Sequence, residues 1–174
     1  AGDSAGGGLA LALCLWLKNH KEPLPSGVIA MSPWTDLTIS GESVETNFEK
    51  DPLFGKTRDS MLYNKDYLGD NDPTNEYISP LFGDYEGFPP LLIQVGSYEM
   101  LLSDSTRVAK KAKEAGGKVK LSIYEGMFHV FQMAMLLMPE SKKAWAEIKR
   151  FLHYLDAEEK EENEMQNISK EEKA

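Results

Sequence analysis

The sequence lacks a second cysteine, a long apolar run and a cluster of basic residues. Cys14 is the single cysteine, so the chain cannot form an internal disulfide. The lack of a disulfide fits a reducing compartment, and we expect a cytoplasmic protein. No apolar run approaches the roughly 20 residues that cross a bilayer, so we expect no membrane span. The net charge is −9 and no basic cluster offsets it. We therefore expect no nucleic-acid partner.

The composition is otherwise that of a globular protein. Hydrophobic residues make up 41% of the 174 residues, enough for one domain with a sizeable core. Residues 158–174 differ, because they are dense in Glu and Lys and have almost no large apolar side chains. We expect one domain over 1–157 and an acidic, disordered tail over 158–174.

The first part of the chain reads as a buried helix, a strand and an irregular stretch. Residues 9–20 are apolar at nearly every position, which predicts a helix buried on several sides. Residues 27–33 form a short apolar run bounded by Gly and Pro, which predicts a strand covered on both faces. Residues 34–88 are rich in Asp, Asn, Gly, Ser and Pro, with one helix expected near Thr57 to Leu68.

Regular patterns return in the second part of the chain. Residues 91–96 predict a buried strand, 103–115 an amphipathic helix, 118–126 an alternating strand and 139–155 a final helix. Strand, helix and strand in this order imply a parallel sheet with a right-handed crossover. The fold class is therefore α/β.

The chain opens on a G-x-S-x-G segment, residues 2–6, directly before the first predicted helix. Glycines on both sides of a serine allow the strained strand-to-helix turn that projects a nucleophile. The helix N-terminus and the amide of Ala5 would then stabilise an oxyanion formed at Ser4. The alternative is a Gly-rich helix start at which Asp3 or Ser4 is only the N-cap.

His129 is the candidate general base. It follows the predicted strand 118–126, and catalytic groups of open α/β sheets gather at the carboxyl ends of strands. Flanked by Met and Phe, it would without Ser4 be read as a hydrogen-bonded core residue. We interpret His20 and His153 as structural or solvated.

Two carboxylates compete for the role of triad acid in the loop after strand 91–96. Glu99 is nearer the strand end, whereas Asp104 stands at a helix start, where a cap or first-turn role is natural. We prefer Glu99, because a carboxylate bonded to the imidazole Nδ1–H fixes the tautomer of the base. The order Ser, acid, His differs from that of trypsin-like proteases, in which His and Asp precede Ser.

With these residues assembled, the sequence resembles the hormone-sensitive-lipase-like carboxylesterases and acetyl esterases of the α/β-hydrolase fold. The matching segments are GDSAGGGLALAL (2–13), MSPWTDLT (31–38), PPLLIQVGSYEMLLSDS (89–105) and GMFHVF (126–131). The resemblance implies a mostly parallel sheet with helices on both faces. It also implies hydrolysis of short-chain acyl esters through an acyl-enzyme, with Ser4, Glu99 and His129 as the triad and Ala5 in the oxyanion site.

The same resemblance implies further features. No metal or organic cofactor is needed, and the partner is a small-molecule ester. Residues 34–88 contribute to a cap over the acyl pocket, and Trp34, Met127, Phe128 and Phe131 either line that pocket or belong to the core. Members of the group often pair as homodimers through their late strand and final helix.

In this group the His-Gly-Gly-Gly oxyanion loop, the cap helices and the first strands precede the nucleophile. We therefore expect this sequence to correspond to the C-terminal part of such a domain, with a sheet edge and much of the pocket exposed. Two other functions stay open at this stage. One is a family member that binds a ligand without catalysis, and the other is a shortened chain without activity alone.

Overall fold

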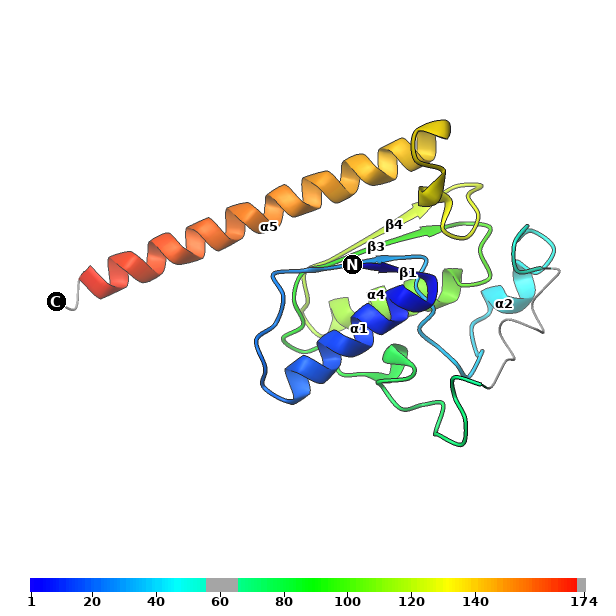
Figure 1. Ribbon diagram of the computed structural model, residues 1–174, viewed down its shortest axis with the longest axis horizontal. Helices are drawn as coiled ribbons and strands as arrows, with labels where there is room; N and C mark the ends of the chain where they lie inside the picture. Colours follow the sequence, from blue (N-terminus) through cyan, green and yellow to red (C-terminus); the bar gives the residue numbers. More distant parts are fainter. Residues whose placement is uncertain (56–65, 172–174) are drawn as a thin grey trace.

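The computed structural model describes residues 1–55 and 66–171, apart from the side chains of 162, 163 and 166–171, and it has an α/β architecture (Figure 1). Four parallel strands form one sheet in the order β1-β2-β3-β4. The strands are β1 (Gly2–Asp3), β2 (Val28–Met31), β3 (Leu91–Gly96) and β4 (Val119–Tyr124). All four carboxyl ends therefore meet at one edge of the sheet.

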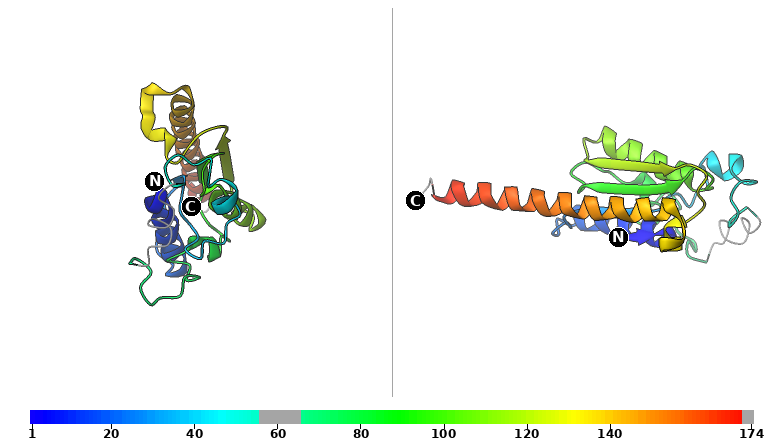
Figure 2. Two further views of the ribbon diagram at one scale, coloured as in Figure 1. Left: turned by 90° about the vertical axis from the view of Figure 1, so that its right-hand side faces the viewer. Right: turned by 90° about the horizontal axis from the view of Figure 1, so that it is seen from above.

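Helices cover both faces of the sheet. On one face lie α1 (Ser4–Asn19) and α4 (Leu102–Glu114), whose apolar side chains form a core cluster with those of β2 and β3. On the other face lies α5 (Pro139–Glu171), which packs its first half on the sheet. Figure 2 shows that the second half of α5 runs beyond the sheet.

The alternation of side chains along β2 explains the two layers. Val28 and Ala30 point into the cluster with α1 and α4, whereas Ile29 and Met31 point toward Ile148 and other apolar residues of α5. Successive side chains of a strand face opposite sides, so a strand covered on both faces is apolar throughout. This confirms the predicted strand at 27–33.

The other regular elements agree with the sequence patterns to within a few residues. Strand 91–96 is β3, helix 103–115 is α4, and strand 118–126 contains β4. Gly116, with φ +82°, follows α4 in the left-handed conformation that commonly ends a helix.

The first helix is present, but it is not buried on several sides. Leu11 and Leu15 are fully buried, whereas Leu9, Leu13 and Trp16 are 61%, 56% and 41% exposed. These three residues share one face of α1, because residues three or four apart in a helix are neighbours. In this structure the sheet and the loops cover only part of the apolar circumference of α1.

Residues 158–171, for which the sequence predicts a disordered tail, continue α5 as far as Glu171. Glu, Lys, Met and Gln are good helix formers, and adding residues to an existing helix costs much less than starting a new one. The packed first half of α5 supplies that start.

The stretch 34–88 contains α2 (Ser43–Thr46) and the 3₁₀ turn η1 (Pro80–Phe82). Most of the helix expected near Thr57 to Leu68 lies outside the described residues. Residues 43–55 wrap around the loop that follows β3. Asn47 donates from its side-chain amide to the carbonyls of Ser97 and Glu99, and Asp51 accepts the amide of Met100. Part of this stretch therefore supports the sheet loops.

Candidate active site

The turn from β1 into α1 has an unusual backbone at Ser4. Its φ is +51°, a left-handed conformation that is strained for a residue with a side chain. Gly2 and Gly8 are needed nearby, because a Cβ on Gly2 would overlap the carbonyl of Gly6 and one on Gly8 would overlap the carbonyl of Trp34. The predicted tight strand-to-helix turn is therefore present.

Ser4 lies at the N-terminus of α1, half-buried beside an exposed Ala5. The amide of Trp34 donates to the carbonyl of Ser4 over 2.9 Å and anchors the turn to the end of β2. The first amides of a helix have no partner within it, and the helix dipole favours negative charge there. The amide of Ala5 is therefore placed to stabilise an oxyanion.

His129 joins the serine to a carboxylate. It lies in the loop between β4 and the 3₁₀ segment η2 (Phe131–Leu137). Its Nε2 is 2.8 Å from Ser4 Oγ, and its Nδ1 is 3.0 Å from Glu99 Oε2. A carboxylate at Nδ1 selects the tautomer with its proton there, which leaves Nε2 free to accept the hydroxyl proton of Ser4.

Glu99 is fully buried and His129 is only 6% exposed. The second oxygen of Glu99, Oε1, accepts the hydroxyl of Ser32 at 2.7 Å and the amide of Gly96 at 2.6 Å. These two donors offset the cost of burying a charge and leave Oε2 for His129.

The structure brings Glu99, and not Asp104, to His129. Asp104 is buried at the start of α4, where it accepts the amides of Thr35 and Asp36 at 2.7 and 2.9 Å. Burial raises the pKa of Asp104 to about 7, although these hydrogen bonds oppose the shift. Asp104 therefore fixes the loop that follows β2.

Sequence reasoning missed two residues that contact this group. The ring of Phe54 packs on that of His129 with centroids 4.4 Å apart, and Ser32 bonds Glu99 across the sheet. Both are far from their partners in the sequence, so no periodicity or spacing marks them. The only signal for Ser32 in the sequence was the segment MSPW (31–34), which is part of the family resemblance.

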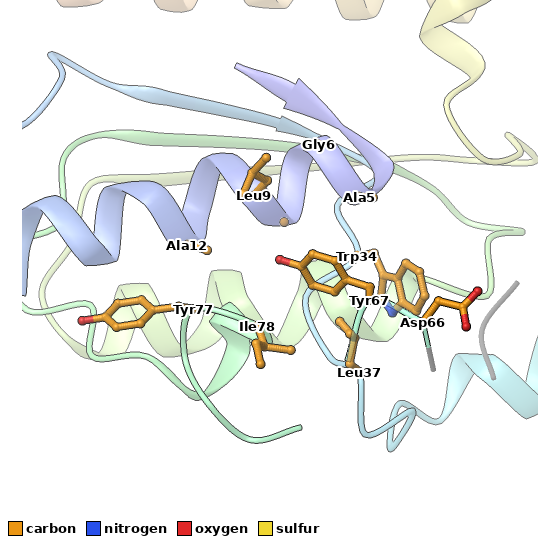
Figure 3. Close-up of a pocket in the computed structure, with 11 residues that line it drawn as sticks. Ala5, Gly6, Leu9, Ala12, Trp34, Leu37, Asp66, Tyr67, Tyr77 and Ile78 are labelled. Carbon is orange, nitrogen blue, oxygen red and sulfur yellow. The ribbon is translucent and has the colours of Figure 1, made fainter. Parts of the chain in front are cut away.

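A cavity of about 430 Å³ begins beside Ala5 and runs along α1 (Figure 3). Its walls are mainly apolar or aromatic, and the figure shows Trp34 and Tyr67 near the Ala5 end and Tyr77 near the other end. The lining residues are Ala5, Gly6, Gly8, Leu9, Ala12, Trp34, Leu37, Asp66, Tyr67, Tyr77 and Ile78.

Of the four residues expected to line a pocket or belong to the core, only Trp34 lines this cavity. Met127 and Phe128 are half-buried in the loop that carries His129. Phe131 is fully buried and packs on Tyr124 with ring centroids 4.8 Å apart. Phe131 therefore lies in the core, one of the two places that the sequence left open for it, because the stretch after His129 turns back onto the sheet.

Cys14, the single thiol, faces the core, and burial raises its pKa to about 11. It is therefore a poor nucleophile compared with a serine bonded to an imidazole. Within residues 1–55 and 66–171 no three His, Cys, Asp or Glu side chains gather as metal ligands would. In the same ranges no helix is long and apolar enough to cross a bilayer.

Comparison with known proteins gives consistent matches. A family model described as "alpha/beta hydrolase fold" matches residues 1–133. An esterase of Acinetobacter venetianus is 46% identical over 157 residues, which cover 90% of this chain and 52% of that protein. An acetyl-hydrolase of Streptomyces hygroscopicus is 40% identical over 144 residues, covering 83% of this chain and 48% of the relative.

Solved structures agree with these relatives. An esterase/lipase from an uncultured bacterium superposes with a TM-score of 0.83 at 39% identity, covering 90% of this chain and 52% of that one. An esterase of the bacterial hormone-sensitive lipase family gives a TM-score of 0.83 at 42% identity, covering 88% and 52%. The chain thus spans about half the length of the relatives it matches.

Proposed function

Since this chain belongs to the α/β-hydrolase fold family, within its hormone-sensitive-lipase-like group, we propose that it hydrolyses carboxylic esters with Ser4 as nucleophile. The observation that carries the proposal is the continuous hydrogen-bonded path from Ser4 through His129 to Glu99. Such a path on a strained strand-to-helix turn activates a hydroxyl that is otherwise a weak nucleophile.

In the proposed reaction, His129 Nε2 takes the proton of Ser4 Oγ as that oxygen bonds to the carbonyl carbon of the ester. The oxyanion that forms accepts the amide of Ala5 at the N-terminus of α1. His129 then gives its proton to the departing alcohol oxygen, which leaves an acyl group on Ser4. Water, deprotonated by His129, attacks this acyl-enzyme and releases the acid.

Glu99 acts on His129 throughout this cycle. Its Oε2 holds the imidazole by Nδ1–H and stabilises the imidazolium that forms after each proton transfer. The two hydrogen-bond donors to Oε1 stabilise the buried carboxylate of Glu99.

The cavity beside Ala5 supports an apolar substrate portion of modest size. A volume of about 430 Å³ lies in the range of small-molecule pockets, and its walls carry few polar groups. We therefore propose short-chain acyl esters as the substrate class.

The test is hydrolysis of a series of p-nitrophenyl esters with increasing acyl length, by the chain and by a Ser4→Ala variant. We expect turnover that is highest for short acyl groups and that falls to background in the variant. Hydrolysis that is unchanged in Ser4→Ala would exclude the proposed nucleophile. Binding of an ester that is recovered intact would favour a ligand-binding role instead.

Homodimer formation and a cytoplasmic location stay predictions. The edge strand β4 carries Ile123, which is 48% exposed, and α5 carries Leu152, also 48% exposed. Both belong to the late strand and final helix that the homodimer prediction names. Sedimentation equilibrium of the purified chain distinguishes a monomer from a dimer.

A further inference from the structure

Three residues near the proposed site share a strained backbone. Ser4, Ser32 and Val130 have φ of +51°, +48° and +53°, in the left-handed region that residues with side chains rarely adopt. Strain of this kind persists only where surrounding contacts enforce it. Ser4 and the residue before Val130 belong to the proposed machinery, whereas Ser32 has so far been described only as a hydrogen-bond donor to Glu99.

Ser32 follows β2 and is completely buried. Its hydroxyl donates to Glu99 Oε1 at 2.7 Å and accepts the amide of Val130 at 3.2 Å. Its own amide donates to the carbonyl of Gln94 at 2.7 Å. One side chain thus connects the acid on the β3 loop to the loop that carries His129.

We propose that Ser32 is a positioning residue that sets the orientation of the Glu99 carboxylate toward His129. This inference rests on the proposed function and names a further residue on which that site depends. The hydrogen bonds from Ser32 and Gly96 to Oε1 fix the plane of the Glu99 carboxylate. In that orientation Oε2 faces Nδ1 of the imidazole. Without the hydroxyl, Gly96 alone holds Oε1, and the amide of Val130 loses its acceptor.

Two other buried carboxylates in this region, Asp51 and Asp104, are bonded to backbone amides of their own. Asp51, on the segment 43–55 that contacts the loop after β3, accepts the amides of Leu53, Phe54 and Met100. Asp104 is engaged by Thr35 and Asp36. Neither carboxylate contacts His129, so the effect of Ser32 on the imidazole runs through Glu99 and the backbone of Val130.

The experiment measures the Nδ1–H proton of His129 by NMR, because that proton lies in the bond to Glu99 and its detection needs no catalysis. Its exchange rate with solvent is compared between the chain, Ser32→Ala and Ser105→Ala. Ser105 is the matched control, since its hydroxyl is equally buried and has no hydrogen-bond partner among the described residues. Thermal unfolding verifies that each variant is folded.

We expect exchange in Ser32→Ala to be at least about tenfold faster than in Ser105→Ala, the change that loss of a hydrogen bond to a charged group allows. The rate at which a fluorophosphonate labels Ser4 should fall by a similar factor. In a Glu99→Gln background, Ser32→Ala should produce little further loss of labelling, because Ser32 acts through that carboxylate.

Equal exchange in folded Ser32→Ala and Ser105→Ala overturns the proposal, and so does a wild-type chain without a protected Nδ1–H proton. If Ser32→Ala does not fold, Ser32→Gly removes the hydroxyl while suiting the left-handed backbone, and the same tenfold difference is expected. A chain that hydrolyses no ester contradicts the proposed function but leaves the exchange comparison valid.

Discussion

The two sides of the contact between Ser4 and His129 differ in how completely the chain surrounds them. On the acid side, Glu99 is fully buried, His129 is 6% exposed, and every oxygen of the carboxylate has a donor. On the nucleophile side, Ala5 is exposed and Leu9 is 61% exposed. Glu99 and His129 are thus almost completely enclosed, whereas the surface beside Ala5 is open.

This difference separates two kinds of experiment. Substitutions on the acid side test a preorganised set of hydrogen bonds in a low-dielectric interior, where each bond has a large effect. Substitutions on the nucleophile side test whether the strained turn at Ser4 is maintained beside an open surface.

The largest expected effect comes from Glu99→Gln. The side-chain amide of Gln would donate to Nδ1 of His129 and place the ring proton on Nε2, where it cannot accept the proton of Ser4. We expect kcat for a short-chain ester to fall by roughly 10²–10⁴-fold with little change in KM. Steady-state kinetics measures it.

Asp104→Asn is the matched control for Glu99→Gln. It makes the same acid-to-amide change on a buried carboxyl, but one bonded to Thr35 and Asp36. We expect its kcat to stay within a few-fold of the original. A loss as large as that of Glu99→Gln would mean that the acid of the site has been misassigned.

A second prediction concerns the nucleophile turn. In Gly8→Ala the new methyl group would overlap the carbonyl of Trp34, so we expect the free energy of unfolding to fall by about 2–4 kcal/mol. Gly6→Ala is the control, because nothing lies within 4 Å of a Cβ at that position. There the higher helix propensity of Ala should leave stability unchanged or raise it by up to about 1 kcal/mol.

Urea unfolding followed by circular dichroism measures both glycine variants. Equal stability of Gly6→Ala and Gly8→Ala would contradict the close approach of α1 to the segment after β2. It would also remove the reason for Gly8 in the turn.

How far the sequence allowed these features to be anticipated depends on the range of the contacts involved. Strands β2, β3 and β4 and helix α4 follow from local sequence patterns. The G-x-S-x-G segment indicated Ser4, and places after predicted strands indicated Glu99 and His129 as candidates. Ser32 and Phe54 could not be found in this way, because each reaches its partner across the sheet or from an irregular segment. Contacts of that kind appear only when the chain is folded.

The exposure of α1 and the length of α5 also differ from what the sequence predicts, for physical reasons. The apolar sequence of α1 indicates how hydrophobic the helix is, but it does not indicate which neighbours cover each face. The exposure of Leu13 therefore could not be predicted from it. For residues 158–171, composition suggested disorder, whereas attachment to a packed helix allows the same residues to stay helical.

The smallest expected effect is a pH dependence from Asp104. Its pKa is raised to about 7 in the folded protein, so the folded state binds its proton more tightly than the unfolded state does. The contribution of this group to stability is therefore greatest in acid and is lost as pH rises from about 4 to 7. Asp104→Asn removes the titration but keeps an acceptor for Thr35 and Asp36.

Urea unfolding at pH 5 and pH 8 measures this effect. We expect the stability of the original chain relative to Asp104→Asn to be lower at pH 8 by on the order of 1–2 kcal/mol. The stability difference between the two chains could instead be the same at both pH values, or the original chain could be relatively more stable at pH 8. Either result would show that Asp104 is ionised throughout the range.

The central claim is that His129, held by Glu99, activates Ser4, and intact-mass spectrometry after incubation with a fluorophosphonate tests it most directly. We expect one adduct on the chain and none on Ser4→Ala, because only an activated hydroxyl attacks the reagent at a useful rate. An unmodified chain, or an adduct that persists in Ser4→Ala, would contradict the claim.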